Sequence, residues 1–155
     1  MKHIHGCLIQ WMEKGVLLIG ESGAGKTTCA LEMVRRGGIW VADDLVELTI
    51  GADRCPLGKA HKKIRGLAWL PSKGIFSVTR AFPSFHAIPE CRIDFVVELI
   101  KKLEKTKEKY LTVGEIWKAM DLRAAFLSVM VDDNVQRTVP RIIRRLRCRE
   151  GSKEG

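Results

Sequence analysis

The sequence lacks a long apolar run. No stretch of its 155 residues approaches the ~18–20 apolar residues that are needed to span a bilayer. The N-terminus also lacks the apolar segment and the small-residue cleavage site of a signal peptide. These absences argue against a membrane or secreted protein, and we expect a cytoplasmic protein with no membrane partner.

Metal-binding and disulfide patterns are also missing. The chain has five cysteines and four histidines, without a C-x-x-C pair and with only one close histidine pair, His3 and His5. An odd number of scattered cysteines is typical of reduced, mostly structural thiols. We therefore expect neither a disulfide framework nor a structural metal site.

Acidic residues are fewer than basic ones. The chain has 27 lysines and arginines against 18 aspartates and glutamates, which gives a formal net charge of +9. Such a field attracts nucleic acids, nucleotides and acidic proteins alike, so charge does not identify the partner. The length and the 46% hydrophobic content fit one folded domain. We expect this domain to cover residues 1–150, followed by a disordered tail over residues 151–155.

A phosphate-binding loop is the most informative motif. Residues 20–27 read G-E-S-G-A-G-K-T, which matches the Walker A pattern G-x-x-x-x-G-K-[ST]. An apolar run over 15–19 precedes it, and helical periodicity from about Thr27 to Arg36 follows it, as a phosphate loop requires. We therefore predict that ATP is bound by Gly20, Glu21, Ser22, Gly23, Ala24, Gly25, Lys26, Thr27 and Thr28.

Each residue type in the loop has a physical purpose. Glycines adopt backbone angles closed to other residues, so successive N–H groups can turn toward phosphate oxygens. Lys26 brings a positive charge to the β- and γ-phosphates, and the Thr27 hydroxyl is the usual protein ligand of Mg²⁺ in this arrangement. The positive end of the following helix faces the same phosphates.

An acidic pair follows the next predicted strand. Residues 39–42 form a short apolar run that ends in Asp43 and Asp44. Nucleotide enzymes place a metal-binding or catalytic carboxylate at this position, one strand after the phosphate loop.

The rest of the chain gives a coarser pattern. We expect strands within 4–11 and 15–19 joined as a hairpin, a loop with local structure over 51–63, and strands over 93–99 and 126–131. An exposed lysine–glutamate segment over 101–109 and a helix from Thr112 come between the last two strands. Apolar residues at helical spacing from Val135 to Leu146 predict a basic C-terminal helix, kinked at Pro140 or starting near it.

Several motifs in order resemble the catalytic domain of HPr kinase/phosphorylase. They cover roughly residues 3–99 and comprise His5-Gly6, residues 15–27, Ala30-Leu31-Glu32, Arg36-Gly37, Val41-Ala42-Asp43-Asp44, Ile64-Arg65-Gly66-Leu67 and residues 93–99. The resemblance implies an α/β P-loop fold, related to that of phosphoenolpyruvate carboxykinase, with a mixed sheet and flanking helices. It also implies a kinase that transfers the γ-phosphoryl group of ATP to a serine of an HPr-like phosphocarrier or another protein.

The resemblance also assigns site residues. His5, Lys26 and Arg65 match catalytic positions of the family, and Thr27 matches the Mg²⁺ ligand. One aspartate of the pair takes the serine proton in that family. We assign this role to Asp43 and place Asp44 nearer the metal, although the order could be reversed. The family's C-terminal helix contacts neighbouring subunits and the carrier, so we expect a homo-oligomer.

The sequence departs from the family pattern at defined positions. Thr28 and Lys63 stand where the family usually has acids, and the basic motif associated with phosphorolysis is not recognisable between Lys118 and Val131. The family's usual N-terminal domain has no counterpart here. These departures argue against phosphorolysis and leave open altered metal use or weak kinase activity.

Three other functions remain open at this point. A kinase for a small molecule would need an enclosing acceptor pocket, for which no motif is visible. A nucleotide-binding regulator could have kept the loop and lost turnover. Nucleic-acid binding has the least support, since no recognition motif accompanies the basic charge.

Overall fold

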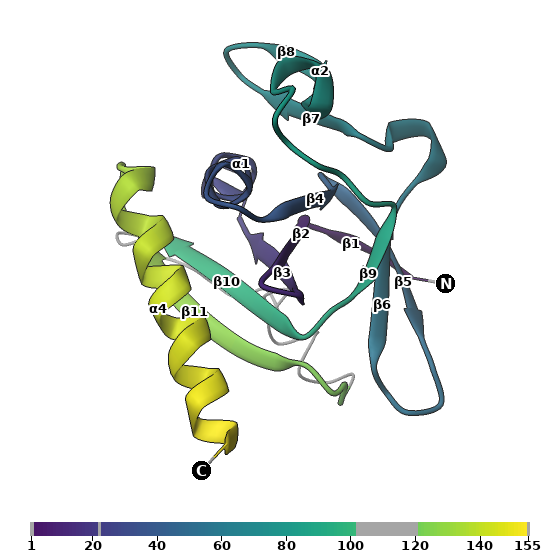
Figure 1. The fold of residues 1–155 in the computed structure, drawn as a ribbon, viewed down its shortest axis with the longest axis vertical. Helices are drawn as coiled ribbons and strands as arrows, with labels where there is room; N and C mark the ends of the chain where they lie inside the picture. The colour runs from purple at the N-terminus through teal and green to yellow at the C-terminus, as the bar shows by residue number, and fades with distance from the viewer. Residues whose placement is uncertain (1, 22, 102–120, 155) are drawn as a thin grey trace.

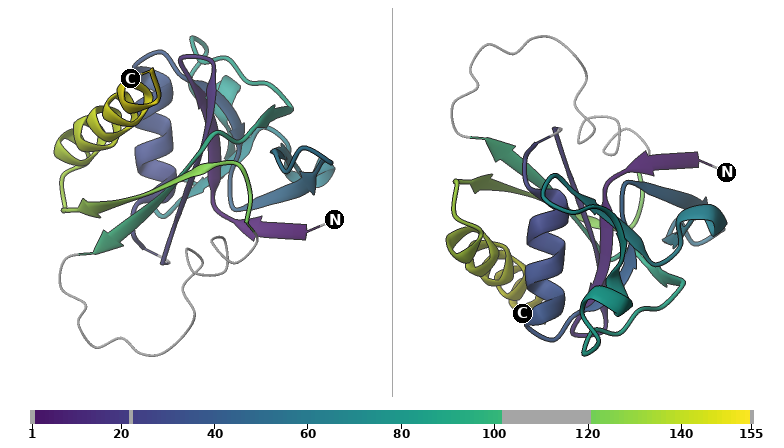
Figure 2. Two further views of the ribbon diagram at one scale, coloured as in Figure 1. Left: turned by 90° about the horizontal axis from the view of Figure 1, so that it is seen from below. Right: turned by 90° about the horizontal axis from the view of Figure 1, so that it is seen from above.

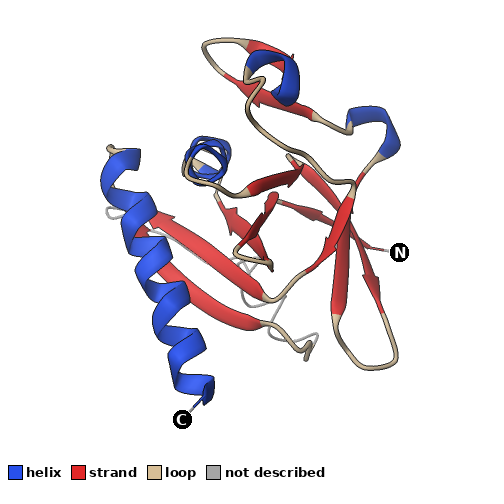
Figure 3. Cartoon of the chain, viewed as in Figure 1, coloured by secondary structure: helices blue, strands red, loops and turns tan. Residues whose placement is uncertain are grey.

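A computed structural model describes residues 2–21, 23–101 and 121–154 of the chain, with side chains up to Arg149. The centre of the fold is a mixed five-stranded sheet in the order β11-β10-β3-β2-β4 (Figures 1 and 3). Strands β3, β10 and β11 run parallel, whereas β2 is antiparallel to both β3 and β4. The bounds are β2 Cys7–Trp11, β3 Lys14–Gly20, β4 Ile39–Ala42, β10 Phe95–Lys101 and β11 Ala125–Val131.

A second, antiparallel sheet packs against the first. Its order is β1-β5-β6-β9, and its strands are β1 Lys2–His5, β5 Leu45–Ile50, β6 Pro56–Ala60 and β9 Glu90–Arg92. A separate hairpin consists of β7 Leu67–Leu70 and β8 Gly74–Ser77. It stands with the short helix α2 Val78–Ala81 at one end of the molecule (Figure 1). The 3₁₀ helix η1 Lys62–Ile64 comes just before it.

Two helices cover the other face of the central sheet. Helix α1 Lys26–Arg35 follows β3 after a loop over residues 21–25, and α4 Val135–Glu154 lies beside it across β10 and β11 (Figure 2). Along β3 the side chains alternate between two cores: Val16 and Leu18 pack under the helices, and Leu17 and Ile19 face the second sheet. Both faces of β3 are buried, which explains its continuous apolar sequence.

The fold confirms the predicted α/β class with a mixed sheet and flanking helices. The 12–15 hairpin turn, the helix after the phosphate loop and the strands near 39–42, 93–99 and 126–131 are present. The prediction of a loop with local structure over 51–63 is wrong at its centre, because residues 56–60 form strand β6. The 3₁₀ helix η1 is consistent with local structure. Pairing with β5 on one side and β9 on the other holds β6 in place despite its proline and glycine.

The C-terminal helix also differs from expectation. Helix α4 begins at Val135, five residues before Pro140, so the alternative of a start near the proline is wrong. It continues to Glu154, through four of the five residues for which the sequence predicts a disordered tail. The predicted helix from Thr112 and the segment 102–109 lie outside the described residues.

Candidate active site

The phosphate loop connects β3 to α1 at the edge where the parallel strands end. Gly20, Gly23 and Gly25 have φ angles of 151°, 82° and 92°, as the sequence predicts for a loop that turns its N–H groups inward. A Cβ on Gly20 would lie 2.7 Å from the Leu99 carbonyl oxygen, so this position also needs glycine for packing against β10. Ser22 lies outside the described residues.

Lys26 folds back across the loop that precedes it. Its ammonium donates hydrogen bonds to the Gly20 carbonyl at 2.9 Å and to the Glu21 carbonyl at 3.2 Å. The lysine is the first residue of α1, and left-handed Gly25 caps this helix. The charge is therefore held over the loop at the positive end of a helix, which is a favourable place for phosphate oxygens.

Asp43 lies immediately behind the loop and is almost completely buried, with 6% of its surface exposed. Its Oδ1 atom accepts a hydrogen bond from the Thr27 hydroxyl at 2.9 Å and another from the Cys7 thiol at 2.8 Å. The Trp69 N–H donates to Oδ2 at 3.1 Å. Both carboxylate oxygens thus have partners, and one partner is the hydroxyl predicted to bind metal.

Asp44 has a different environment, although it is the next residue. It adopts a left-handed backbone conformation with φ of 70°, which aspartate tolerates better than most residues. Its carboxylate is 77% exposed and lies 3.7 Å from Nδ1 of His5, whose side chain is equally open. Strand β4 ends at Ala42, so the two adjacent carboxylates can both face the loop region instead of opposite sides of a sheet.

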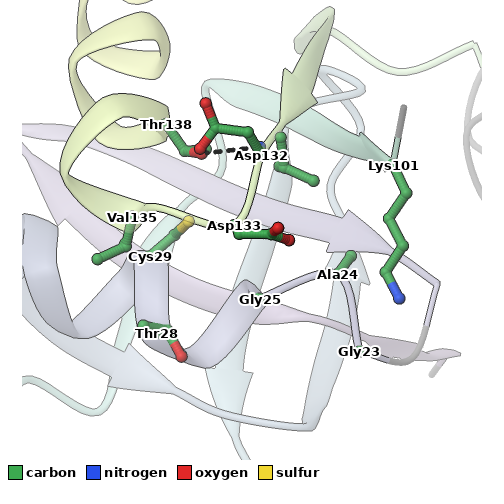
Figure 4. Close-up of a pocket in the computed structure, with 11 residues that line it drawn as sticks. Gly23, Ala24, Gly25, Thr28, Cys29, Lys101, Asp132, Asp133, Val135 and Thr138 are labelled. Atoms are coloured by element: carbon green, nitrogen blue, oxygen red, sulfur yellow. Dashed lines mark hydrogen bonds between the residues drawn. The ribbon is translucent and has the colours of Figure 1, made fainter. Parts of the chain in front are cut away.

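A cavity of about 690 Å³ opens beside the phosphate loop. Figure 4 shows it between the start of α1 and the segment that joins β11 to α4, with Cys29 and Val135 close together and Lys101 on the opposite side. Burial, and then the nearby Glu32 carboxylate, raise the pKa of the Cys29 thiol to about 12, so this wall is uncharged. The lining residues are Gly23, Ala24, Gly25, Thr28, Cys29, Lys101, Val131, Asp132, Asp133, Val135 and Thr138.

The hydrogen bonds around Asp43 do not include Arg65, Lys63 or Thr28. Arg65 is exposed between η1 and β7, and no hydrogen bond or ion pair joins it to another described residue. Lys63 is exposed in η1. Thr28 faces the cavity rather than Asp43. Among the described residues, no group of three or more histidine, cysteine or acidic side chains could hold a metal ion.

Comparison with known families supports what the loop and the acidic pair indicate. The model of the HPr Serine kinase C-terminal domain family matches residues 1–149, which is nearly the whole chain. The chain belongs to this family.

Curated relatives of this family domain carry the name HPr kinase/phosphorylase. The protein from Caldicellulosiruptor bescii is 41% identical over 95 residues, which cover 61% of this chain and 30% of the relative. The protein from Geobacillus thermodenitrificans is 33% identical over 131 residues, which cover 83% of this chain and 42% of the relative. The chain thus spans less than half the length of these relatives.

A solved structure has the same fold as this HPr kinase family domain. The HPr(Ser) kinase/phosphatase from Coxiella burnetii superposes with a TM-score of 0.75 over 99% of this chain and 95% of the other, at 16% sequence identity. This likeness shows the architecture. No described helix has the length and hydropathy needed to cross a bilayer. The homo-oligomer stays a prediction.

Two residues of the site escaped sequence reasoning. Cys7 is 1% exposed in β2 and reaches both Asp43 and Thr27, whose Oγ1 lies 3.6 Å from its sulfur. Burial raises the pKa of Cys7 well above its usual value, and the Asp43 charge adds to this effect, so the thiol remains a neutral donor. Trp69 takes part through its main chain, which carries no sequence signal. The position of Cys7 one residue after Gly6, opposite Leu18 of β3, could have suggested its proximity to the loop.

Proposed function

We propose that this HPr kinase family domain is an ATP- and Mg²⁺-dependent protein serine kinase. It transfers the γ-phosphoryl group of ATP to a serine of an HPr-like phosphocarrier or another protein. The observation that carries the proposal is the hydrogen bond between Thr27 and Asp43, which ties the acidic pair to the phosphate loop. Asp44 follows Asp43 directly, and its carboxylate is 77% exposed and so accessible to an acceptor.

The geometry of the phosphate loop supports nucleotide binding. The left-handed glycines, the N-terminus of α1 and Lys26 converge on one edge of the central sheet. The adjoining cavity is large enough for a nucleoside, and its uncharged wall at Cys29 and Val135 suits a flat base. Lys26 would exchange its bonds to the loop carbonyls for bonds to the β- and γ-phosphates.

The donors near the loop fit a magnesium ion. Thr27 offers a hydroxyl oxygen and Asp43 a carboxylate oxygen 2.9 Å away, and Mg²⁺ prefers such hard oxygen ligands. Two protein ligands are enough, because magnesium in nucleotide sites completes its shell with phosphates and water. When bound, the ion would neutralise charge that develops on the transferred group.

The two aspartates exchange the roles first assigned to them from the sequence. Asp43 is buried with both oxygens engaged, so it is poorly placed to meet a serine hydroxyl, and metal binding with Thr27 suits it better. Asp44 is open to solvent and accompanied by His5, so we assign the base role to Asp44. The serine oxygen attacks the γ-phosphorus, the bond to the β-phosphate oxygen breaks, and Asp44 accepts the hydroxyl proton. His5 orients this carboxylate, and Arg65 is retained as a neutralising charge for the phosphoryl oxygens.

The test is transfer of label from γ-labelled ATP to an HPr-like protein and to a panel of serine peptides, with and without Mg²⁺. We expect labelling that needs Mg²⁺ and that Lys26→Ala and Asp44→Asn reduce by at least 100-fold. Each variant must retain the thermal midpoint of the parent. ATP binding without any labelled acceptor, in the HPr-like protein, the peptides or a small-molecule panel, would refute the kinase proposal and favour a nucleotide-binding regulator.

A further inference from the structure

One long stretch of the chain contains basic residues but no acidic ones. Between Arg54 and Glu90 the chain contains no aspartate or glutamate, yet it contains six lysines and arginines. This span includes η1, the β7–β8 hairpin and α2, which stand together at one end of the molecule (Figure 1). We use the name basic hairpin for residues 62–77.

The outer face of the basic hairpin carries an exposed apolar pair. Trp69 and Ile75 are directly opposite partners in the β7–β8 ladder, with 55% and 73% of their surfaces exposed. Their neighbours Ala68 and Phe76 form the next pair and pack inward against the core under α1. The alternation fixes the outward direction of Trp69 and Ile75, because successive side chains of a strand point to opposite faces.

Exposed lysines stand at the start of this hairpin. Lys62 and Lys63 are exposed in η1, and no acidic side chain among the described residues forms an ion pair with either of them. Nε2 of His61 beside them lies 3.9 Å from a carboxylate oxygen of Glu47, so this acid is paired with a residue other than the two lysines. The surface thus combines apolar anchors with positive charge that is not neutralised locally.

The basic hairpin is joined directly to the proposed catalytic centre. The main-chain N–H of Trp69 donates to Oδ2 of Asp43 at 3.1 Å. The same residue therefore exposes its indole ring to solvent and contacts the acidic pair through its backbone. A chain bound on this face would therefore lie on the strand whose main chain contacts Asp43. This adjacency distinguishes the hairpin from basic helix α4, which lies across the other half of the molecule (Figure 2).

We propose that the basic hairpin is the docking surface for the phosphoryl acceptor, and that the acceptor is an acidic protein segment. An apolar side chain of this segment packs on Trp69 and Ile75, and carboxylates near its serine face Lys62 and Lys63. Aromatic anchors with a charged rim are typical of protein recognition sites. This inference rests on the proposed kinase function, but binding of an acidic peptide to the basic hairpin can be measured without phosphoryl transfer.

The test is fluorescence anisotropy with a labelled 15-residue peptide that has one central serine, an adjacent leucine and flanking glutamates. We expect it to bind at least tenfold more tightly than the same peptide with lysines in place of the glutamates. The pair Trp69→Ser and Ile75→Ser, and separately the pair Lys62→Glu and Lys63→Glu, should each weaken binding about tenfold. Higher salt should weaken binding of the acidic peptide, because exposed charges are screened.

Matched pairs elsewhere on the surface serve as controls. Ile100 and Met130 are also exposed partners in a ladder, so Ile100→Ser with Met130→Ser removes a comparable apolar pair. Arg144→Glu with Arg147→Glu on α4 makes the same change in net charge as the lysine pair. These controls should leave peptide binding within about twofold of the parent, and both control pairs should bind ATP like the parent.

The outcomes separate this inference from the kinase proposal. Selective binding of the acidic peptide without phosphoryl transfer would support the docking surface and refute the kinase. Phosphoryl transfer that shows no preference for peptides with acidic flanks would overturn the docking surface and leave the kinase proposal intact. The same conclusion would follow if the control pairs weakened peptide binding as much as the hairpin pairs do. Failure of the acidic peptide to bind would also overturn it, as would tighter binding of a 15-nucleotide single-stranded DNA that is lost in the same hairpin variants.

Discussion

Asp43 and Asp44 are adjacent in the chain but occupy opposite environments. Asp43 is 6% exposed and accepts hydrogen bonds from a hydroxyl, a thiol and a main-chain N–H, whereas the Asp44 carboxylate is open beside His5. Asp44 has a left-handed conformation, so the backbone turns between the two carboxylates. A repeated residue in a motif can therefore serve two chemical purposes when the backbone turns between its members.

Replacing Asp44 should have the largest effect on catalysis. We expect Asp44→Asn to lower kcat by about 10²–10⁴, because an amide cannot accept the serine proton. The KM for ATP and the Mg²⁺ concentration for half-maximal activity should change little, since Asp44 is exposed and away from the Thr27 hydroxyl. Steady-state kinetics over a range of Mg²⁺ concentrations measures both quantities. If Asp44→Asn instead required more Mg²⁺ and kept its kcat at saturating Mg²⁺, Asp44 would be the metal ligand and Asp43 the base.

Replacing Asp43 should shift metal use and stability together. Asp43→Asn presents an N–H₂ group to at least one donor among Cys7, Thr27 and Trp69, which leaves a buried polar group unpaired. We expect about 1–3 kcal/mol lower stability in urea unfolding and about tenfold more Mg²⁺ for half-maximal activity. An unchanged Mg²⁺ requirement would remove Asp43 from the metal site. Asp44→Asn is the control, and its stability should stay within about 0.5 kcal/mol of the parent.

Local sequence predicts the conformation of the phosphate loop well and the contacts around Asp43 poorly. Gly20 to Thr27 and the strand and helix beside it are adjacent in sequence, so spacing and residue type suffice. The contacts of Asp43 with Cys7 and with Trp69 join residues 36 and 26 positions apart, and depend on how β2 and β7 pack. The 51–63 span shows the same limit, because β6 owes its strand conformation to partners that its own sequence does not identify.

Cys7 offers a smaller test of the buried side. Its thiol supports the Oδ1 atom that Thr27 also uses, so we expect Cys7→Ala to raise the Mg²⁺ requirement about two- to fivefold and to cost about 1 kcal/mol of stability. Cys7→Ser keeps a donor at the same position and should restore most of the Mg²⁺ response. If serine and alanine variants behave alike, Cys7 acts only by filling space between β2 and α1.

Glu32 provides a benchmark for a buried carboxylate without a chemical role. It lies on α1, 8% exposed, and accepts hydrogen bonds from Arg35 and Arg36 at 2.6–2.9 Å. The Arg35 hydrogen bond first, with a further contribution from Arg36, lowers the pKa of Glu32 to about 2. We expect Glu32→Gln to lower stability by about 1–3 kcal/mol at pH 7 and to leave kcat and the Mg²⁺ requirement unchanged.

The pH dependence of stability in Glu32→Gln tests whether Glu32 stabilises the fold through its charge. A lowered folded-state pKa means that the unfolded chain binds the proton first as pH falls, so the stabilisation by Glu32 is complete above about pH 4.5 and is lost toward pH 2. The stability difference between parent and Glu32→Gln should therefore be constant from pH 8 to about pH 5 and shrink below it, as urea unfolding at each pH would measure. A difference that stays constant down to pH 3 would mean that Glu32 acts through packing rather than charge. If Glu32→Gln also raised the Mg²⁺ concentration for half-maximal activity, the effect of Asp43→Asn could not be attributed to its contact with Thr27. Loss of any buried carboxylate near α1 would then be enough to change the Mg²⁺ requirement.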